Sequence, residues 1–160
     1  LRNANFVMYA ASQFPKVEFG AVEVTPATDD LYWVEVEVKN DKAYPTSSDR
    51  AVALKRAVMD TITARAGGGA EIVEVPAAPT AVDAWNRAAQ SEAVTARGTE
   101  FRLKGREMKR FCVLARMSGA EGSIEFTVRS KTGGTAVKKI TLKVGSDHSN
   151  KNNISKIAAF

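Results

Sequence analysis

The clearest pattern in the chain is a strict alternation of apolar and charged residues between Leu31 and Asn40. Val34, Val36 and Val38 occupy alternate positions, and the residues that follow each of them are charged. Successive side chains of a β-strand point to opposite faces of its sheet. The segment therefore predicts a strand with one buried and one solvent-exposed face, as in an antiparallel sheet.

A helical spacing precedes this strand, between Ala4 and Phe14. Phe6, Ala10 and Phe14 recur one helical turn apart, which places apolar side chains on one face of a helix. Pro15 predicts the end of this helix, since the residue before a proline disfavours the α conformation.

Turn-forming residues separate the elements around the first strand. Alternation begins at Val17, and the polar residues 26–30 predict a turn before the next strand. Residues 40–48 predict a loop, after which Ser48 or Asp49 is positioned to cap a short helical turn.

Glycine-rich stretches divide the rest of the chain. Gly67–Gly69 predicts the turn of a hairpin between residues 58–66, which fit either a helix or a strand, and a strand at 72–75. A second hairpin is expected across Gly133 and Gly134. Further strands are expected at 99–103, 110–115, 123–129 and 135–144, and a helix at 84–90.

Short strands joined by glycine turns, without a βαβ rhythm, predict an all-β fold. We expect an immunoglobulin-like antiparallel β-sandwich over residues 15–145. A short N-terminal helix at 1–14 precedes it, and a flexible polar C-terminal tail at 146–160 follows it. Because the chain begins at Leu1 and not at Met, we expect the helix to lead from a missing upstream domain.

The composition excludes several classes of chemistry. The 160 residues include one Cys, Cys112, and one His, His148. A zinc site normally needs three or four ligands, mostly His and Cys, so we expect no metal and no cofactor in this chain. Cys112 lies among strand formers and is predicted to be a buried apolar side chain. No apolar run is long enough to span a membrane.

Other candidates for catalysis have structural explanations. Asp29 and Asp30 fill a turn, whereas Glu35 and Glu37 occupy the exposed face of a strand, so neither pair is expected to converge in a pocket. The glycine stretches lack the Gly-x-x-x-x-Gly-Lys-Ser/Thr pattern of a phosphate-binding loop. We therefore expect no enzyme within these residues.

Basic residues are densest between positions 102 and 110, in a chain with a net charge of +5. Arg102, Lys104 and Arg106 are candidates for binding phosphate or an acidic neighbouring domain, and Lys109 and Arg110 extend the patch. A solvated sheet face is the alternative interpretation. Elsewhere Lys and Arg alternate with Asp and Glu, which does not favour nucleic acid as a partner.

Aromatic residues give a further candidate surface. Tyr44, Trp85 and Trp33 are positioned to form a platform for carbohydrate or peptide if they are exposed. Packing in the core or at a domain interface is the alternative for the same residues.

The order of segments also resembles a known family. A helix ending at Phe14-Pro15 leads into a strand, then comes the Leu31–Asn40 strand, and then Tyr44-Pro45-Thr46. This order, together with Gly119–Arg129 and the stretch from Gly133 to Ile140, resembles the β-sandwich region after the catalytic domain of bacterial zinc carboxypeptidase-like proteins of the carboxypeptidase A type. The resemblance covers most of residues 15–145.

This resemblance implies a non-catalytic accessory domain that stabilises or positions an upstream zinc-dependent catalytic domain. It also implies a secreted or periplasmic protein. The family's zinc-binding His-x-x-Glu pair and distant His have no counterpart in a chain with one His. We expect the exposed side of the N-terminal helix and the Tyr44-Pro45-Thr46 loop to contact the neighbour. The alternatives are an independent carbohydrate- or peptide-binding module and a phosphate or nucleic-acid binder that uses the basic patch.

Overall fold

The computed structural model describes residues 2–73 and 91–143. The expected helix at 84–90 with Trp85, the tail at 146–160 and His148 lie outside these residues. The elements are α1 (Arg2–Ser12), β1 (Val17–Pro26), β2 (Leu31–Asn40), α2 (Asp49–Ala53), β3 (Asp60–Val73), β4 (Glu92–Ala93), β5 (Thr99–Phe101), β6 (Glu107–Ser130) and β7 (Gly134–Lys143). None of the described helices is long and apolar enough to cross a membrane.

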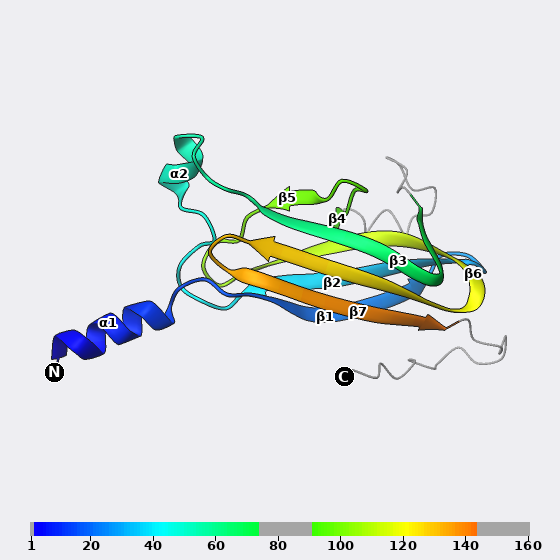
Figure 1. Cartoon of the computed structure of the whole chain (residues 1–160), viewed down its shortest axis with the longest axis horizontal. Helices are drawn as coiled ribbons and strands as arrows, with labels where there is room; N and C mark the ends of the chain where they lie inside the picture. Colours follow the sequence, from blue (N-terminus) through cyan, green and yellow to red (C-terminus); the bar gives the residue numbers. More distant parts are fainter. Residues whose placement is uncertain (1, 74–90, 144–160) are drawn as a thin grey trace.

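The strands form two antiparallel layers (Figure 1). The first layer consists of β1, β2 and the first half of β6. The second consists of β7, the second half of β6, the first half of β3 and β5, while the second half of β3 pairs with β6 in the first layer. The short β4 adds a parallel pair to the first layer. This arrangement confirms the prediction of an all-β antiparallel sandwich with a short N-terminal helix.

The core lies between the two layers. Val34, Val36 and Val38 project into it from β2, as the alternation predicted, and all three are fully buried. Phe126 and Val128 of β6 meet them from the second layer, and both are also fully buried. The layers are thus held together by one continuous apolar cluster, whose burial is the main stabilising contribution.

A sharp bend carries β3 and β6 from one layer to the other, at the end of the molecule opposite α1 (Figure 1). The pairing register of the two strands shifts between Gly68 and Ala70. A Cβ atom on Gly69 would lie 2.9 Å from the carbonyl oxygen of Glu121, and one on Gly122 would lie 2.7 Å from Cβ of Ala70. The two backbones approach this closely because the positions at the bend are glycines.

Two strand predictions are therefore wrong. The hairpin expected across Gly67–Gly69 is not formed by the described residues, because residues 60–73 form one strand that pairs with β6 along both of its halves. The segments at 110–115 and 123–129 likewise belong to the single strand β6. The glycines mark a bend within a strand pair, not a turn between neighbouring strands.

Other local predictions are confirmed. β2 spans Leu31–Asn40, and β6 and β7 form the expected hairpin. The hydroxyl of Ser48 caps α2 by accepting a hydrogen bond from the backbone N–H of Ala51 at 3.2 Å. The strand expected at 99–103 is shorter than predicted and ends at Phe101.

Candidate functional site

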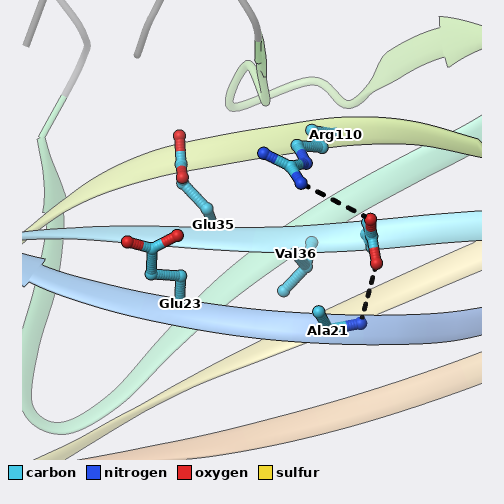
Figure 2. Close-up of a pocket in the computed structure, with 6 residues that line it drawn as sticks. Ala21, Glu23, Glu35, Val36 and Arg110 are labelled. Atoms are coloured by element: carbon cyan, nitrogen blue, oxygen red, sulfur yellow. Dashed lines mark hydrogen bonds and ion pairs between the residues drawn. The ribbon is translucent and has the colours of Figure 1, made fainter. Parts of the chain in front are cut away.

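A shallow depression lies on the outer face of the first layer (Figure 2). Its acidic residues come from β1 and β2, where Glu23 and Glu35 are cross-strand neighbours. Glu37 is engaged with the backbone: its Oε2 accepts a hydrogen bond from the N–H of Ala21 at 3.1 Å, and its Oε1 lies 3.7 Å from the guanidinium of Arg110. Glu37 thereby satisfies an N–H group that the β1 bulge leaves without a ladder partner.

Glu35 is 9% exposed and accepts a hydrogen bond from the hydroxyl of Ser91 at 2.8 Å. Its carboxylate lies beside Cys112, its cross-strand neighbour on β6. Burial and the negative charge of Glu35 raise the pKa of the Cys112 thiol to about 11. The thiol is therefore protonated at neutral pH, and a protonated thiol is a poor nucleophile.

These groups support no catalytic centre. Within residues 2–73 and 91–143, no group of three or more His, Cys, Asp or Glu side chains could hold a metal ion. Asp60 is another buried acid, 1% exposed, and neither of its carboxylate oxygens has a hydrogen-bond partner among the described residues. Since Asp60 faces the core at the start of β3, its carboxylate is inaccessible to a substrate from solution.

The other region of interest is the end of the sandwich that carries both helices (Figure 1). We call it the helical end, and it comprises α1 with residues 13–14, the loop 41–48, α2 with residues 54–58, and the turn 102–106. Hydrogen bonds connect these segments. The N–H of Tyr44 donates to the carbonyl of Gln13 at 3.2 Å, and the N–H of Arg106 donates to the carbonyl of Lys42 at 2.9 Å.

Buried polar side chains fix the loop between these segments. Asn40 is fully buried, and its amide donates hydrogen bonds to the carbonyls of Tyr44 at 2.8 Å and Lys104 at 3.1 Å. The hydroxyl of Thr46 accepts a hydrogen bond from the N–H of Leu103 at 3.0 Å. Because these bonds are shielded from water, they hold the loop and the 102–106 turn in one arrangement.

The helical end brings together candidates from two separate sequence hypotheses. Tyr44 is 47% exposed and its ring packs on that of Phe14, with 5.9 Å between the centroids. Lys104 and Arg106 are exposed on the 102–106 turn. The guanidinium of Arg102 forms an ion pair with Asp49 of α2, and this contact lowers the pKa of the Asp49 carboxyl.

Other candidates do not join this surface. Trp33 is 8% exposed and packs with Cys112 and Leu114 in a small apolar cluster, so it cannot stack on a ligand from solution. Arg102 and Lys104 do not lie on a strand, since β5 ends at Phe101.

The basic patch expected between residues 102 and 110 is likewise divided. Arg110 lies on the outer face of the first layer, beside Glu37, and not with the residues of the 102–106 turn.

The exposed apolar residues of α2 and the segment after it were not identified from the sequence. Val52, Leu54 and Val58 are 39%, 55% and 52% exposed, respectively. The sequence predicted a short helical turn capped by Ser48 or Asp49, but it gave no indication that these apolar side chains would be exposed.

Comparisons with solved structures find two distant likenesses. A Salmonella alpha-2-macroglobulin mutant matches with a TM-score of 0.47 and 15% identity over 81% of this chain, which spans 7% of that protein's chain. The GAE domain of GGA2p from Saccharomyces cerevisiae matches with a TM-score of 0.41 and 7% identity, covering 82% of this chain and 92% of that domain.

No curated protein matches the chain. A family model described as a domain of unknown function, DUF8731, matches residues 16–154, which include the whole sandwich and the loops of the helical end. The chain therefore belongs to the DUF8731 family.

Proposed function

We propose that this domain is a non-catalytic accessory module that attaches to a neighbouring protein domain through its helical end. The observation that carries this proposal is the exposure of α1. Phe6 and Met8 are 71% and 72% exposed, and every side chain from Asn3 to Tyr9 is exposed. Contiguous exposed apolar surface of this kind marks interaction sites in folded proteins.

The alternatives have less support. A carbohydrate or peptide platform would need several exposed aromatic rings on one face, whereas Trp33 is buried and the ring of Tyr44 is packed on Phe14. A phosphate- or nucleic-acid-binding patch would need clustered and available basic groups. Arg102 is already paired with Asp49, and Arg110 lies beside Glu37 on another face.

The sequence resemblance supplies a proposal for the neighbour, namely a zinc carboxypeptidase-like catalytic domain. In that arrangement α1 would lie between the two domains, and its apolar side chains would be covered by the catalytic domain. The zinc and the catalytic residues would belong to the neighbour. The sandwich would contribute stability and orientation, because docking a rigid module on an apolar surface removes that surface from water.

Photocrosslinking in the cell that makes this protein tests the proposal. A benzophenone amino acid at Met8 should form crosslinks to a protein domain outside this chain, identified by mass spectrometry of the joined peptides. The control is the same group at Ala27, an exposed position between β1 and β2 at the opposite end of the sandwich. Crosslinks from Met8 that are no more specific than those from Ala27 would refute the proposal.

A further inference from the structure

We propose that the helical end binds an apolar groove with an acidic rim, with α1 in the groove and the basic residues of α2 and the 102–106 turn against the rim. This inference rests on the proposed docking function and specifies the chemistry of the partner. It follows from the distribution of charge at the helical end, from the apolar surface of α1, and from the rigid connection between the two.

The helical end has an excess of available positive charge. None of its exposed basic side chains forms an ion pair with another described residue; these are Arg50, Lys55, Arg56, Lys104 and Arg106. Two of the acidic side chains beside them are already in ion pairs, since Asp49 pairs with Arg102 and Asp41 pairs with Lys39 at 2.7 Å. The carboxylate of Glu107 accepts a hydrogen bond from the backbone N–H of Lys104 at 2.5 Å and keeps its charge, which offsets one of the five basic groups. An acidic partner surface would complement this charge.

The apolar surface of α1 extends around much of the helix. Phe6 and Ala10 lie one turn apart on one side of the helix, whereas Met8 and Tyr9 lie on other sides and are 72% and 62% exposed. A helix that is apolar on most sides is suited to being surrounded. A helix that lies on a flat lipid surface has one strongly polar face instead. A groove in a protein therefore fits α1 better than a membrane surface does.

A second copy of this chain fits less well, because two identical helical ends would bring their unpaired basic groups together. Like charges across an interface disfavour association. The apolar side chains of Val52, Leu54 and Val58, which are 39%, 55% and 52% exposed, lie among those basic groups. In a complex with a partner whose groove has an acidic rim, these three side chains would add apolar contacts to those made by α1.

The parts of this surface are held in fixed positions before binding. The Phe14–Tyr44 ring contact and the hydrogen bond from Tyr44 to Gln13 join the end of α1 to the loop. Asn40 joins the loop to the 102–106 turn, and Arg102 joins that turn to α2. A preorganised surface loses little conformational entropy on binding, so it selects a partner that matches the groove and the rim together.

The test measures the yield of the Met8 crosslink in three backgrounds. The first is the otherwise unchanged protein, and the second carries Lys55→Glu and Arg56→Glu. The third carries Arg97→Glu and Lys139→Glu, a matched reversal of two exposed basic residues away from the helical end. The thermal unfolding of each variant is recorded to establish that it folds.

We expect the Lys55→Glu/Arg56→Glu reversal to lower the crosslink yield about fivefold or more, and the control reversal to leave it unchanged. When the crosslinking is repeated in a lysate of the same cells, raising the salt concentration from about 0.05 to 0.5 M should also lower the yield, since the screening length becomes short. The joined peptides should contain apolar residues with Asp or Glu nearby in the partner.

A folded Lys55→Glu/Arg56→Glu variant with an unchanged yield would overturn the acidic rim while leaving the docking function intact. Crosslinks to a second copy of this chain, or to lipid alone, would overturn the protein groove. The complete absence of specific crosslinks from Met8 would overturn both the inference and the proposed function.

Discussion

Glu35 and Cys112 show how a pair of neighbouring side chains can be chemically inactive by position. They face each other on the outer side of the first layer, and both are at most 9% exposed. Removal from water disfavours the thiolate, and the adjacent carboxylate disfavours it further, so both effects raise the pKa of the thiol in the same direction.

Replacement of the carboxylate should therefore lower the pKa of the thiol. We predict that Glu35→Gln brings the Cys112 pKa below its present value of about 11, because desolvation alone then raises it. Thiolate absorbance near 240 nm, corrected with a Cys112→Ser variant for tyrosine ionisation, measures this value for the single cysteine of the chain. Glu125→Gln on the second layer is the control and should leave the titration unchanged. An unchanged titration in Glu35→Gln would contradict the electrostatic contribution of Glu35.

The same shift gives a pH dependence of stability. An unfolded cysteine ionises near the reference value of 9.0, whereas the folded thiol ionises near 11. Between these values the unfolded chain releases a proton that the folded chain retains, so the free energy of unfolding falls as the pH rises from 9 to 11. Below pH 9 the thiol is protonated in both states, and its contribution to stability is fully present.

At this scale the sequence predicted the burial of Cys112 but not that of Glu35, and for Trp33 it offered packing in the core beside a role in a ligand platform. Alternation along Leu31–Asn40 correctly assigned the two faces of the strand. It could not indicate that Ser91, more than fifty residues later in the sequence, would donate a hydrogen bond to the carboxylate of Glu35 on the outer face. Periodicity reports which side chains share a face, and long-range packing decides whether that face reaches water.

At the scale of elements, the bend shared by β3 and β6 determines the fold. β6 pairs with β2 through its first half and with β7 through its second half, so it belongs to both layers. Two strands can turn together only where their backbones can approach closely, and Gly69 and Gly122 provide that space. The bend therefore depends on the absence of side chains at a few positions.

A pair of substitutions tests this dependence. Gly122→Ala places a Cβ atom 2.7 Å from Cβ of Ala70 and 2.9 Å from its backbone nitrogen, so we expect a loss of about 1–3 kcal/mol in the free energy of unfolding. Gly119→Ala is the control, because its Cβ atom would meet nothing closer than 3.7 Å. Urea denaturation followed by tryptophan fluorescence measures both. Equal stability of the two variants would show that the close approach at Gly122 does not constrain the bend.

The same bend explains which strand predictions failed. The signal of Gly67–Gly69 is the same for a tight hairpin and for a bend within a longer strand pair, because both need residues without a Cβ atom. In a hairpin the segments before and after the glycines pair with each other, whereas in a bend both segments pair with another strand. In this chain both halves pair with β6, about fifty residues away in sequence, and no local pattern encodes that choice. The β6–β7 hairpin was predicted correctly because its two strands and its turn are adjacent in sequence.

At the scale of the whole molecule, the two ends of the sandwich differ in character. The glycine bend lies at one end, whereas both helices, the Tyr44 loop and the basic 102–106 turn lie at the other (Figure 1). Sequence reasoning selected Tyr44, Lys104 and Arg106 under separate hypotheses, since about sixty residues separate the loop from the turn. Asn40, with hydrogen bonds to both segments, is the residue that makes them one surface.

If the helical end is a docking surface, its apolar residues should be dispensable for the fold. We predict that Phe6→Ser/Met8→Ser changes the melting temperature of the domain by less than about 2 °C, because both side chains are more than 70% exposed and bury little surface in the described structure. Phe126→Ala is the matched contrast: Phe126 is fully buried in the core, and its loss should cost about 3–5 kcal/mol.

The same Phe6→Ser/Met8→Ser variant should lose association with the neighbouring domain while its sandwich remains folded, as judged by its thermal unfolding and circular dichroism. This comparison distinguishes residues that stabilise the fold from residues that bind a partner. Only substitutions of the first kind change the free energy of unfolding of the isolated domain. A large drop in melting temperature would instead mean that α1 packs against the sandwich in solution, and the apolar surface of the helix would then belong to the fold and not to an interface.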